Sequence, residues 1–361
     1  MARLTMRDVA DRAGVSLGTV SNVLNKPDVV ADETRERVMS AIQEIGFVRN
    51  DAARQLRGGK AQAIGLVTLD IDNPFFTEVA RGVEAAADET NLMLFLCSSA
   101  GSLERENKQL RSLEEQRVAG ILMSPLERNP SKNVRAIHER GTPIVLLDRH
   151  RSTRQWCSAS VNDTRGAQLV AEHLVELGHK KIGLLNGPIT LTPCLERRES
   201  FVATLAQHGL EIAEPHDVEA PEMTIEAGGH AGAELFEGKT WPTALFCTND
   251  LLALGAERAA LSRGIRIPEQ VSIVGYDDIR YAATSLVPLT TVRNPAFELG
   301  YEATRLLIDE ATDGPDHKHR RLQLEPDLVV RSSTSATPRN GRTTGRSAAK
   351  SAARRSRTAI K

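Results

Sequence analysis

Several kinds of segment are missing or scarce in this chain of 361 residues. The four cysteines are widely spaced and form neither a CxxC pair nor a Cys/His ligand pattern: Cys97, Cys157, Cys194 and Cys247. We interpret them as free thiols and predict no bound metal. The start of the chain has no apolar run of signal-peptide length, and no segment approaches the roughly 20 apolar residues of a membrane span. We therefore expect a cytoplasmic protein.

Patterns typical of enzymes are also scarce. The nine histidines are scattered, and none belongs to a nucleophile–base or metal motif, so we predict that the chain is not an enzyme. No GxGxxG follows the first predicted strand, which argues against a dinucleotide, and we predict no cofactor.

Charge is distributed unevenly although the formal net charge is only -1. Residues 1–60 contain ten Lys/Arg and eight Asp/Glu, whereas residues 335–361 contain eight Lys/Arg and no acidic residue. Subtraction from the totals of 46 and 47 leaves 28 basic and 39 acidic side chains in residues 61–334, a balance of -11. The basic ends of the chain therefore indicate that they bind a polyanion, whereas the acidic centre does not.

Residues 5–25, TMRDVADRAGVSLGTVSNVLN, have the pattern of two short helices joined by a tight turn. Thr5 and Asp8 form a capping box for the first helix, and Ser16 caps the second. Small or short side chains form the outward face of the second helix: Leu17, Gly18, Ser21, Asn22 and Asn25. Such a face suits DNA base edges and phosphates, although a solvated polar surface would have the same pattern. A third helix is predicted over residues 32–45.

Residues 49–60, RNDAARQLRGGK, are basic and helix-permissive but too short to form a stable helix alone in water. Arg54 is one of four basic residues in this segment, and Leu56 is its one large apolar residue. The segment could fold on DNA and insert Leu56 between base steps of the minor groove. Alternatively, it is a flexible tether in which Leu56 packs elsewhere.

The stretch MRDVADRAGVSLGTVSNVLN, followed by TRERVMSAIQEIGFVRNDAARQLRGGK, resembles the helix-turn-helix head and hinge helix of the lactose-repressor/galactose-repressor (LacI/GalR) family. The resemblance continues to about residue 334. It implies that Leu17, Gly18 and Asn22 select bases in the major groove. It also implies that Thr19 and Ser21 hold the helix on the DNA backbone, and that Leu56 is a minor-groove lever.

Two positions depart from the family pattern. Gly18 has no side chain with which to read a base. Ala31 stands where the family usually has a capping Ser, so Asp32 is expected to begin the third helix instead.

From residue 61 onward, short apolar runs alternate with amphipathic helical patterns. Seven runs are predicted strands: residues 63–69, 92–97, 120–124, 143–148, 181–187, 243–248 and 271–277. Near-continuous apolar runs separated by helices indicate buried parallel strands, hence a doubly wound α/β architecture. Ligands of such sheets bind beyond the carboxyl ends of the strands.

Polar and aromatic residues follow several of these strands. Asp70 comes directly after the first strand, and Asp148, Asn249 and Asp277 end or follow later ones. Together with aromatic rings and arginine side chains, such groups could stack on a sugar ring and hydrogen-bond its hydroxyls. Taken singly, each residue could instead cap a helix or belong to the core.

The body also resembles periplasmic pentose- and hexose-binding proteins. This resemblance implies effector contacts at eight positions: Asn73, Phe75, Phe76, Asp148, Arg149, Arg197, Asn249 and Asp277. It implies two similar subdomains, about 61–161 plus 293–322 and 162–292 plus 323–334, with the effector in the cleft between them. Arg293 and Asn294 depart from sugar-binding relatives, which often place Gln before the following Pro, and could favour an acidic or otherwise different sugar.

The sequence thus predicts a helix-turn-helix domain (1–48), a hinge (49–60), an effector-binding and dimerisation domain (61–334) and a disordered basic tail (335–361). No C-terminal leucine heptad is visible, so we expect a homodimer rather than a tetramer. The predicted function is a repressor that binds palindromic operator DNA under the control of a small sugar or sugar derivative, and we expect a pentose or hexose. The alternative is an activator or dual regulator with a non-sugar effector such as a purine, or with a phosphorylated co-regulator.

Overall fold

The computed structural model describes residues 4–48, 61–127, 129–148, 155–237 and 240–337. The predicted hinge, with Arg54 and Leu56, lies outside these residues, as do Arg149 and the tail from residue 338 onward. The chain divides into two compact units, Met1–Ala61 and Gln62–Lys361, which we call the head and the body.

The head is a small helical domain. It consists of α1 (Met6–Ala13), α2 (Leu17–Asn25), the 3-10 turn η1 (Pro27–Val29) and α3 (Asp32–Ile45). One apolar core joins the three helices, with Val9, Val20 and Val38 buried at its centre. Gly14 and Gly46, both with positive φ, end α1 and α3 in the left-handed conformation that glycine adopts without strain. As expected, α3 begins at Asp32, and Ala31 provides no side-chain cap.

The first half of the body is built on a six-stranded sheet with the order β11-β5-β4-β3-β1-β2. Its elements are β1 (Ala63–Thr68), α5 (Pro74–Asp88), β2 (Met93–Ser98), α6 (Leu103–Glu115), β3 (Ile121–Met123), α7 (Lys132–Glu139), β4 (Ile144–Leu147), β5 (Cys157–Val161), α12 (Ala296–Asp313), η3 (Gly314–Asp316) and β11 (Arg321–Leu324). All its strand pairs are parallel. One core packs α5 and α12 on one face of the sheet, and a second packs α6 and α7 on the other. We call this half the N-terminal subdomain.

The second half repeats this design on a sheet with the order β12-β10-β9-β8-β6-β7. Its elements are α8 (Asp163–Glu176), β6 (Ile182–Asn186), α9 (Thr192–Gln207), η2 (Glu214–His216), β7 (Asp217–Glu219), α10 (Ile225–Leu235), β8 (Ala244–Cys247), α11 (Asp250–Ser262), β9 (Ser272–Asp277), β10 (Thr290–Arg293) and β12 (Asp327–Val329). Here α10 and α11 share one core, and α8 and α9 share another. Only the pairing of β10 with β12 is antiparallel among the strands described. We call this half the C-terminal subdomain.

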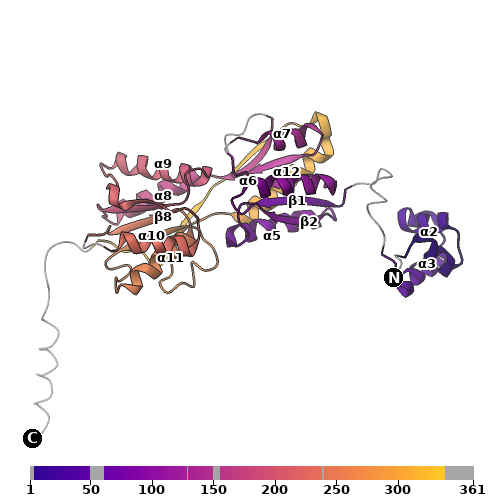
Figure 1. The fold of residues 1–361 in the computed structure, drawn as a ribbon, viewed down its shortest axis with the longest axis horizontal. Coiled ribbons are helices and arrows are strands. Elements are labelled where there is room, and N and C mark those ends of the chain that lie inside the picture. The colour runs from indigo at the N-terminus through magenta and orange to yellow at the C-terminus, as the bar shows by residue number, and fades with distance from the viewer. Residues whose placement is uncertain (1–3, 49–60, 128, 149–154, 238–239, 338–361) are drawn as a thin grey trace, which may run out of the picture. The chain divides into compact units, whose positions relative to one another are not determined.

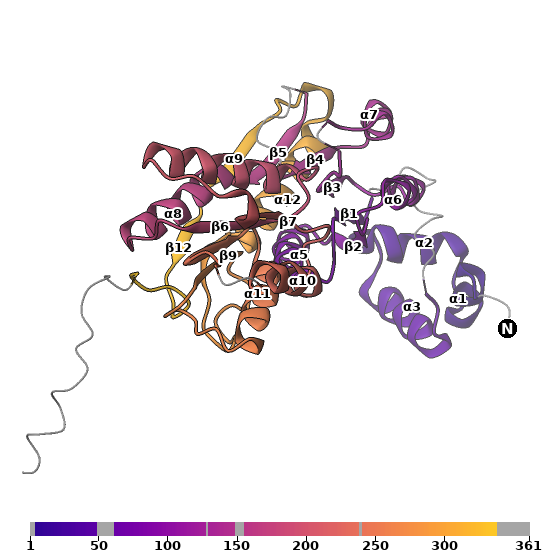
Figure 2. The same ribbon diagram turned by 60° about the vertical axis from the view of Figure 1, so that its left-hand side comes forward.

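The chain passes between the subdomains three times, as the ribbon views show (Figures 1 and 2). It crosses from β5 to α8, returns from β10 to α12, and crosses again from β11 to β12. Each sheet is therefore completed by a strand from the C-terminal end of the body. Such multiple connections let two rigid halves turn about a shared hinge region.

Close helix packing depends on glycines in the N-terminal subdomain. A Cβ atom at Gly82 of α5 would lie 1.9 Å from the carbonyl oxygen of Phe297, and one at Gly300 of α12 would lie 2.0 Å from that of Val79. Any larger residue at either position would force α5 and α12 apart, because both obstacles are backbone atoms.

All seven predicted strands are present, within one or two residues of the predicted ends. Five further strands were not predicted: β5, β7, β10, β11 and β12. The helix α9 starts at Thr192, with Pro193 in its first turn, and Arg197 lies in its second turn. Among the described residues, no helix is long and apolar enough to cross a membrane.

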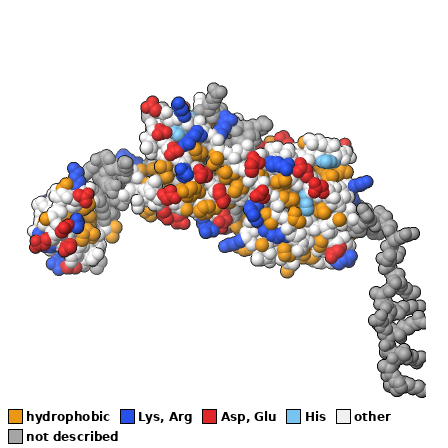
Figure 3. Space-filling model, turned by 180° about the vertical axis from the view of Figure 1, so that it is seen from behind, with side chains coloured by type: hydrophobic (Ala, Val, Ile, Leu, Met, Phe, Trp, Pro, Cys, Tyr) orange, Lys and Arg blue, Asp and Glu red, His pale blue; other side chains and the backbone are white. Residues whose placement is uncertain are grey.

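Acidic and basic side chains are interspersed over the face of the body that Figure 3 shows. Apolar side chains are nevertheless exposed on the edge strand β2, where Met93 is 66% exposed, Phe95 38% and Leu96 39%.

Candidate nucleic-acid interface and effector site

The N-terminus of α2 is held by its capping residue. Ser16 accepts a hydrogen bond from the backbone N–H of Thr19 (3.1 Å) through its Oγ, and the two side-chain hydroxyls lie 2.9 Å apart. Both hydroxyls are thus fixed in position before any partner arrives. Val20 and Val23 point into the head core, while Leu17, 45% exposed, points outward.

Among the other residues predicted to contact DNA, three are hydrogen-bonded within the head and two are exposed on the outward face of α2. Asn25 donates hydrogen bonds to the Ser21 carbonyl (2.8 Å) and hydroxyl (3.2 Å), so both residues are partly engaged within α2. Thr5 donates to the Asp8 carboxylate through its N–H and hydroxyl, both at 2.7 Å, and these bonds lower the pKa of Asp8. Gly18 and Asn22 are exposed on the outward face.

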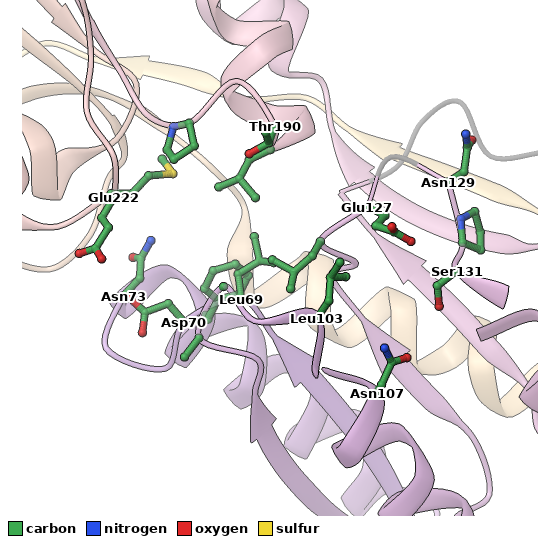
Figure 4. A pocket seen from close by; sticks show the side chains of 18 of the residues that line it. Leu69, Asp70, Asn73, Leu103, Asn107, Glu127, Asn129, Ser131, Thr190 and Glu222 are labelled. Atoms are coloured by element: carbon green, nitrogen blue, oxygen red, sulfur yellow. The ribbon is translucent and has the colours of Figure 1, made fainter. Parts of the chain in front are cut away.

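A cavity of about 1640 Å³ opens between the two subdomains of the body. Figure 4 shows Glu222 and Thr190 of the C-terminal subdomain facing Asp70 and Asn73 of the N-terminal subdomain across it. This volume exceeds the roughly 300–1,000 Å³ of a typical small-molecule site. The subdomains would have to approach each other to enclose a ligand as small as a single sugar ring.

Three of the predicted effector-binding residues line this cavity: Asp70, Asn73 and Phe76. Asn73 is also the N-cap of α5, because its Oδ1 accepts a hydrogen bond from the N–H of Phe75 (3.0 Å). The Phe75 ring packs in the core and meets the Phe76 ring edge-on, with centroids 5.1 Å apart. Phe75 therefore supports Phe76 from behind rather than lining the cavity.

Four other predicted residues lie at strand ends but do not line the cavity: Asp148, Asn249, Asp277 and Arg293. Asp148 follows β4 with a φ of 54° and accepts a hydrogen bond from the Ser124 hydroxyl at 3.1 Å. Asn249 caps α11 through the Leu252 N–H and donates to the Met223 carbonyl. Arg293, at the end of β10, donates to Asp278 at 2.9 Å.

Arg197 lies in a buried ionic cluster. Its Nε donates to Asp163 at 2.7 Å, its Nη1 donates to the Thr248 carbonyl at 2.7 Å, and the same Nη1 lies 3.6 Å from Asp277. The guanidinium also stacks over the ring of Tyr276, 3.7 Å from its centroid. We refer to Asp163, Arg197 and Asp277 as the ionic cluster.

Two carboxylates share one guanidinium in this cluster, and burial shifts the pKa of Asp277. Burial raises the pKa of Asp277 to about 7, although the nearby Arg197 opposes the shift. Asn294 donates to the Asp277 carboxylate at 2.8 Å. Asp277 also has a φ of 110°, a backbone conformation that side-chain-bearing residues rarely adopt. Such strain is typical of a functional position.

Most of the cavity lining was missed by the sequence analysis. The missed polar residues include Asn107, Glu127, Ser131, Thr190 and Glu222. Thr190 follows the predicted strand at 181–187, so the same rule of strand ends could have found it. Glu222 follows β7, a strand of three residues that has no apolar run to reveal it.

The arrangement is suited to binding rather than catalysis. Carboxylate, amide and hydroxyl groups converge from both subdomains on a large open cavity, so they can hydrogen-bond a polar ligand and draw the halves together. Cys194 is a buried neutral thiol, because desolvation raises its pKa to about 12.

Comparison with known proteins agrees with both units. Residues 5–50 match the family model for bacterial regulatory proteins of the lacI family, and residues 171–334 match the periplasmic binding protein-like domain. The HTH-type transcriptional repressor PurR of Aliivibrio salmonicida is 32% identical over 329 residues, covering 91% of this chain and 98% of that protein. The ribose operon repressor of Escherichia coli K12 is 33% identical over 330 residues, covering 91% and 99%.

A solved structure of the lac repressor dimer, bound to operator and the anti-inducer ONPF, superposes with a TM-score of 0.80 at 28% identity. It covers 93% of this chain and 100% of the repressor chain. The predicted fold class and the absence of enzymatic function are confirmed by these matches. The chain therefore belongs to the LacI family of DNA-binding transcriptional regulators.

Proposed function

We propose that this regulator is a repressor that binds a palindromic operator as a homodimer and releases it when a small sugar or sugar derivative enters the cavity. The main support for this proposal is the cavity, whose two walls come from different subdomains and present hydrogen-bonding side chains to each other. A ligand that contacts both walls favours the closed arrangement by its differential affinity for the two states.

The chemistry of the lining supports a polyhydroxylated effector. Among the described lining residues Phe76 is the one aromatic ring, whereas Asp70, Asn73, Asn107 and Glu222 offer oxygen and amide groups. A sugar ring needs a single stacking face and many hydrogen-bond partners, whereas a flat purine gains most from stacking on both faces. The similarity to the ribose operon repressor favours a pentose or hexose as well.

Exposed apolar side chains support the dimer. Met93, Phe95 and Leu96 lie on β2, an edge strand, where burial against a second copy would remove them from water. The lac repressor neighbour was solved as a dimer on its operator. In a homodimer with twofold symmetry, two heads would match the two half-sites of a palindrome.

On DNA, we propose that α2 lies in the major groove, with Leu17, Gly18 and Asn22 against base edges. Ser16, Thr19, Ser21 and Asn25, together with Thr5 at the start of α1, would contact the backbone or base edges nearby. From the sequence, Arg54 would contact phosphates and Leu56 would open the minor groove at the centre of the operator. The basic tail would add salt-dependent affinity through counterion release. Such a regulator would act in the cytoplasm, at the nucleoid.

A thermal-shift screen of the full chain against pentoses, hexoses and their acids tests the effector class. A ligand that binds the folded cavity raises the melting temperature, because binding stabilises the native state. We expect at least one sugar to do so, and the shift to be lost in Glu222→Ala. A screen in which purines stabilise the chain and no sugar does would reject the sugar proposal.

Gly18 gives a sharp test of the groove contact. A Cβ atom there would meet nothing closer than the Ser16 Oγ at 3.6 Å, so packing within the head does not require glycine. Gly18→Ala should therefore stabilise α2 by up to about 1 kcal/mol. We nevertheless expect weaker operator binding, because the added methyl group would occupy space against the bases. Stronger or unchanged operator binding would remove Gly18 from the interface.

Leu56→Ala tests the lever. We expect the variant to lose operator affinity while it still binds the effector in the thermal-shift assay. Retained operator affinity would favour the tether interpretation of residues 49–60.

A further inference from the structure

A second polar cluster lies in the N-terminal subdomain, away from the cavity. It contains Cys157 at the start of β5, Glu310 near the end of α12, and His317 and His319 in the loop between η3 and β11. One donor atom from each residue lies within 4.8 Å of the others. The strands β5 and β11 both begin here, so the cluster lies at the amino ends of the sheet, opposite the strand ends that meet the cavity.

The donor atoms are already oriented toward one another. Cys157 Sγ lies 3.1 Å from His317 Nε2, and His319 Nδ1 lies 3.8 Å from Glu310 Oε2. A tetrahedral ion with bonds of roughly 2.0–2.3 Å places its ligands about 3.3–3.8 Å apart. The donor atoms therefore need only small shifts to enclose an ion.

Neighbouring side chains hold the ligands in this orientation. His317 Nδ1 lies 3.0 Å from the Asp313 carboxylate, which leaves Nε2 to face the thiol. His138 Nε2 lies 3.3 Å from Glu310 Oε1, which leaves Oε2 to face the cluster. Carboxylate–histidine pairs of this kind are the usual outer support of metal-bound imidazoles.

A hydrogen-bonded polar cluster without an ion accounts for only part of this geometry. The thiol can donate to His317, but Glu310 Oε2 and His319 Nδ1 are both buried and have no hydrogen-bond partner. Glu310 as a whole is only 6% exposed. Leaving a buried carboxylate oxygen unsatisfied is costly, and a cation between the four residues would satisfy both atoms at once.

We propose that Cys157, Glu310, His317 and His319 form a four-coordinate site for a divalent transition-metal ion, and that zinc is its best match. One thiolate, two imidazoles and one carboxylate are all zinc ligands, and the carboxylate makes the set less suited to copper(I). The ion would join β5 to the loop that follows α12, two segments separated by more than 150 residues in the sequence. This site differs from the prediction that the cysteines bind no metal. Its ligands form no short-range sequence motif from which the site could have been predicted.

Cobalt(II) substitution of the full-length protein tests the site directly. After treatment with a chelator, the chain should bind one cobalt ion and develop the near-ultraviolet thiolate-to-cobalt charge-transfer band and the intense visible bands of a tetrahedral site. Added zinc should displace the cobalt and remove these bands. The melting temperature of the metal-free chain should rise on addition of zinc.

Variants identify the ligands. Cys157→Ser should abolish the charge-transfer band, whereas Cys97→Ser, on β2 of the same sheet and outside the cluster, should retain it. Asp313→Asn should weaken cobalt binding roughly tenfold to a hundredfold through loss of support for His317. Because the Asp313 side chain is 56% exposed, this variant keeps the test valid even if Cys157→Ser fails to fold. A wild-type chain without the band, or a band that survives Cys157→Ser, would overturn the proposal.

Discussion

Polar side chains near strand ends of the body occur both in the cavity lining and in the ionic cluster, but their surroundings differ. Asp70 and Glu222 line an open cavity, where a ligand can replace water at little cost to the fold. Arg197 is buried and pairs with both Asp163 and Asp277, which are buried as well. Polar residues are therefore common at strand ends, and their burial decides whether they stabilise the fold or bind a ligand directly.

The largest expected effect is on the ionic cluster. Arg197→Ala would leave Asp163 and Asp277 buried without their cation, and should lower the free energy of unfolding of the body by about 3–5 kcal/mol. Arg198→Ala is the matched control, because the neighbouring Arg198 pairs with Asp217 nearer the surface and should cost only about 0–1 kcal/mol. Urea denaturation measures both. Equal losses would contradict the structural role of the cluster.

Substitutions in the cavity lining should weaken effector binding and leave stability nearly unchanged. Asp70→Ala and Glu222→Ala should each weaken effector binding roughly tenfold to a hundredfold, because each removes a charged hydrogen-bond partner. Their free energies of unfolding should stay within about 0.5 kcal/mol of wild type. Glu226→Ala, an exposed acid on α10 that does not line the cavity, should bind effector normally in calorimetric titration. Wild-type affinity in both lining variants would move the effector elsewhere.

The stability of the ionic cluster should depend on pH, because the pKa of Asp277 is shifted. The pKa of Asp277 is about 7 in the folded body, above its ordinary value of 3.8, so the folded state binds this proton more tightly than the unfolded state. The contribution of Asp277 to stability is therefore full below pH 3.8 and is lost as the pH rises through about 7. Melting temperatures should show this loss between pH 5 and 8 in wild type but not in Asp277→Asn. Parallel curves would exclude the shifted carboxyl.

Asn73 both lines the cavity and caps α5, so its effect on stability should lie between that of the ionic cluster and that of the other lining residues. Asn73→Ala removes the cap of α5 and should cost about 1 kcal/mol, whereas Asn73→Asp keeps an accepting oxygen and should cost little. If Asn73 also contacts the effector through its amide, both variants should weaken binding. An Asn73→Asp variant with normal effector affinity would assign the residue to the helix alone.

The architecture could be predicted from the sequence because the central strands are continuous apolar runs. β1, β4 and β8 are buried along most or all of their length and have no competing helical period. β5, CSASV, could not be predicted because a fully buried strand of small and hydroxyl side chains has no apolar run. β7 and β12 could not be predicted because their three residues, DVE and DLV, include an acidic side chain and lack the continuous apolar run of β3, ILM.

The sequence predicted that site residues lie at strand ends, but it did not predict which of their side chains are buried. Asp70 and Asp277 follow or end strands in the same way, and only the packing distinguishes the cavity residue from the buried one. The proposed metal site could not be predicted from the sequence, because Cys157 and His317 meet only through the pairing of β5 with β11.

The central claim is that occupancy of the cavity controls DNA binding. The most direct measurement is the affinity of the full chain for its operator by fluorescence anisotropy, with and without a saturating sugar identified in the thermal-shift screen. We predict that the sugar raises the operator Kd by roughly fivefold to 150-fold, the range of a typical allosteric coupling. An operator Kd that is unchanged by a sugar shown to occupy the cavity would contradict the claim.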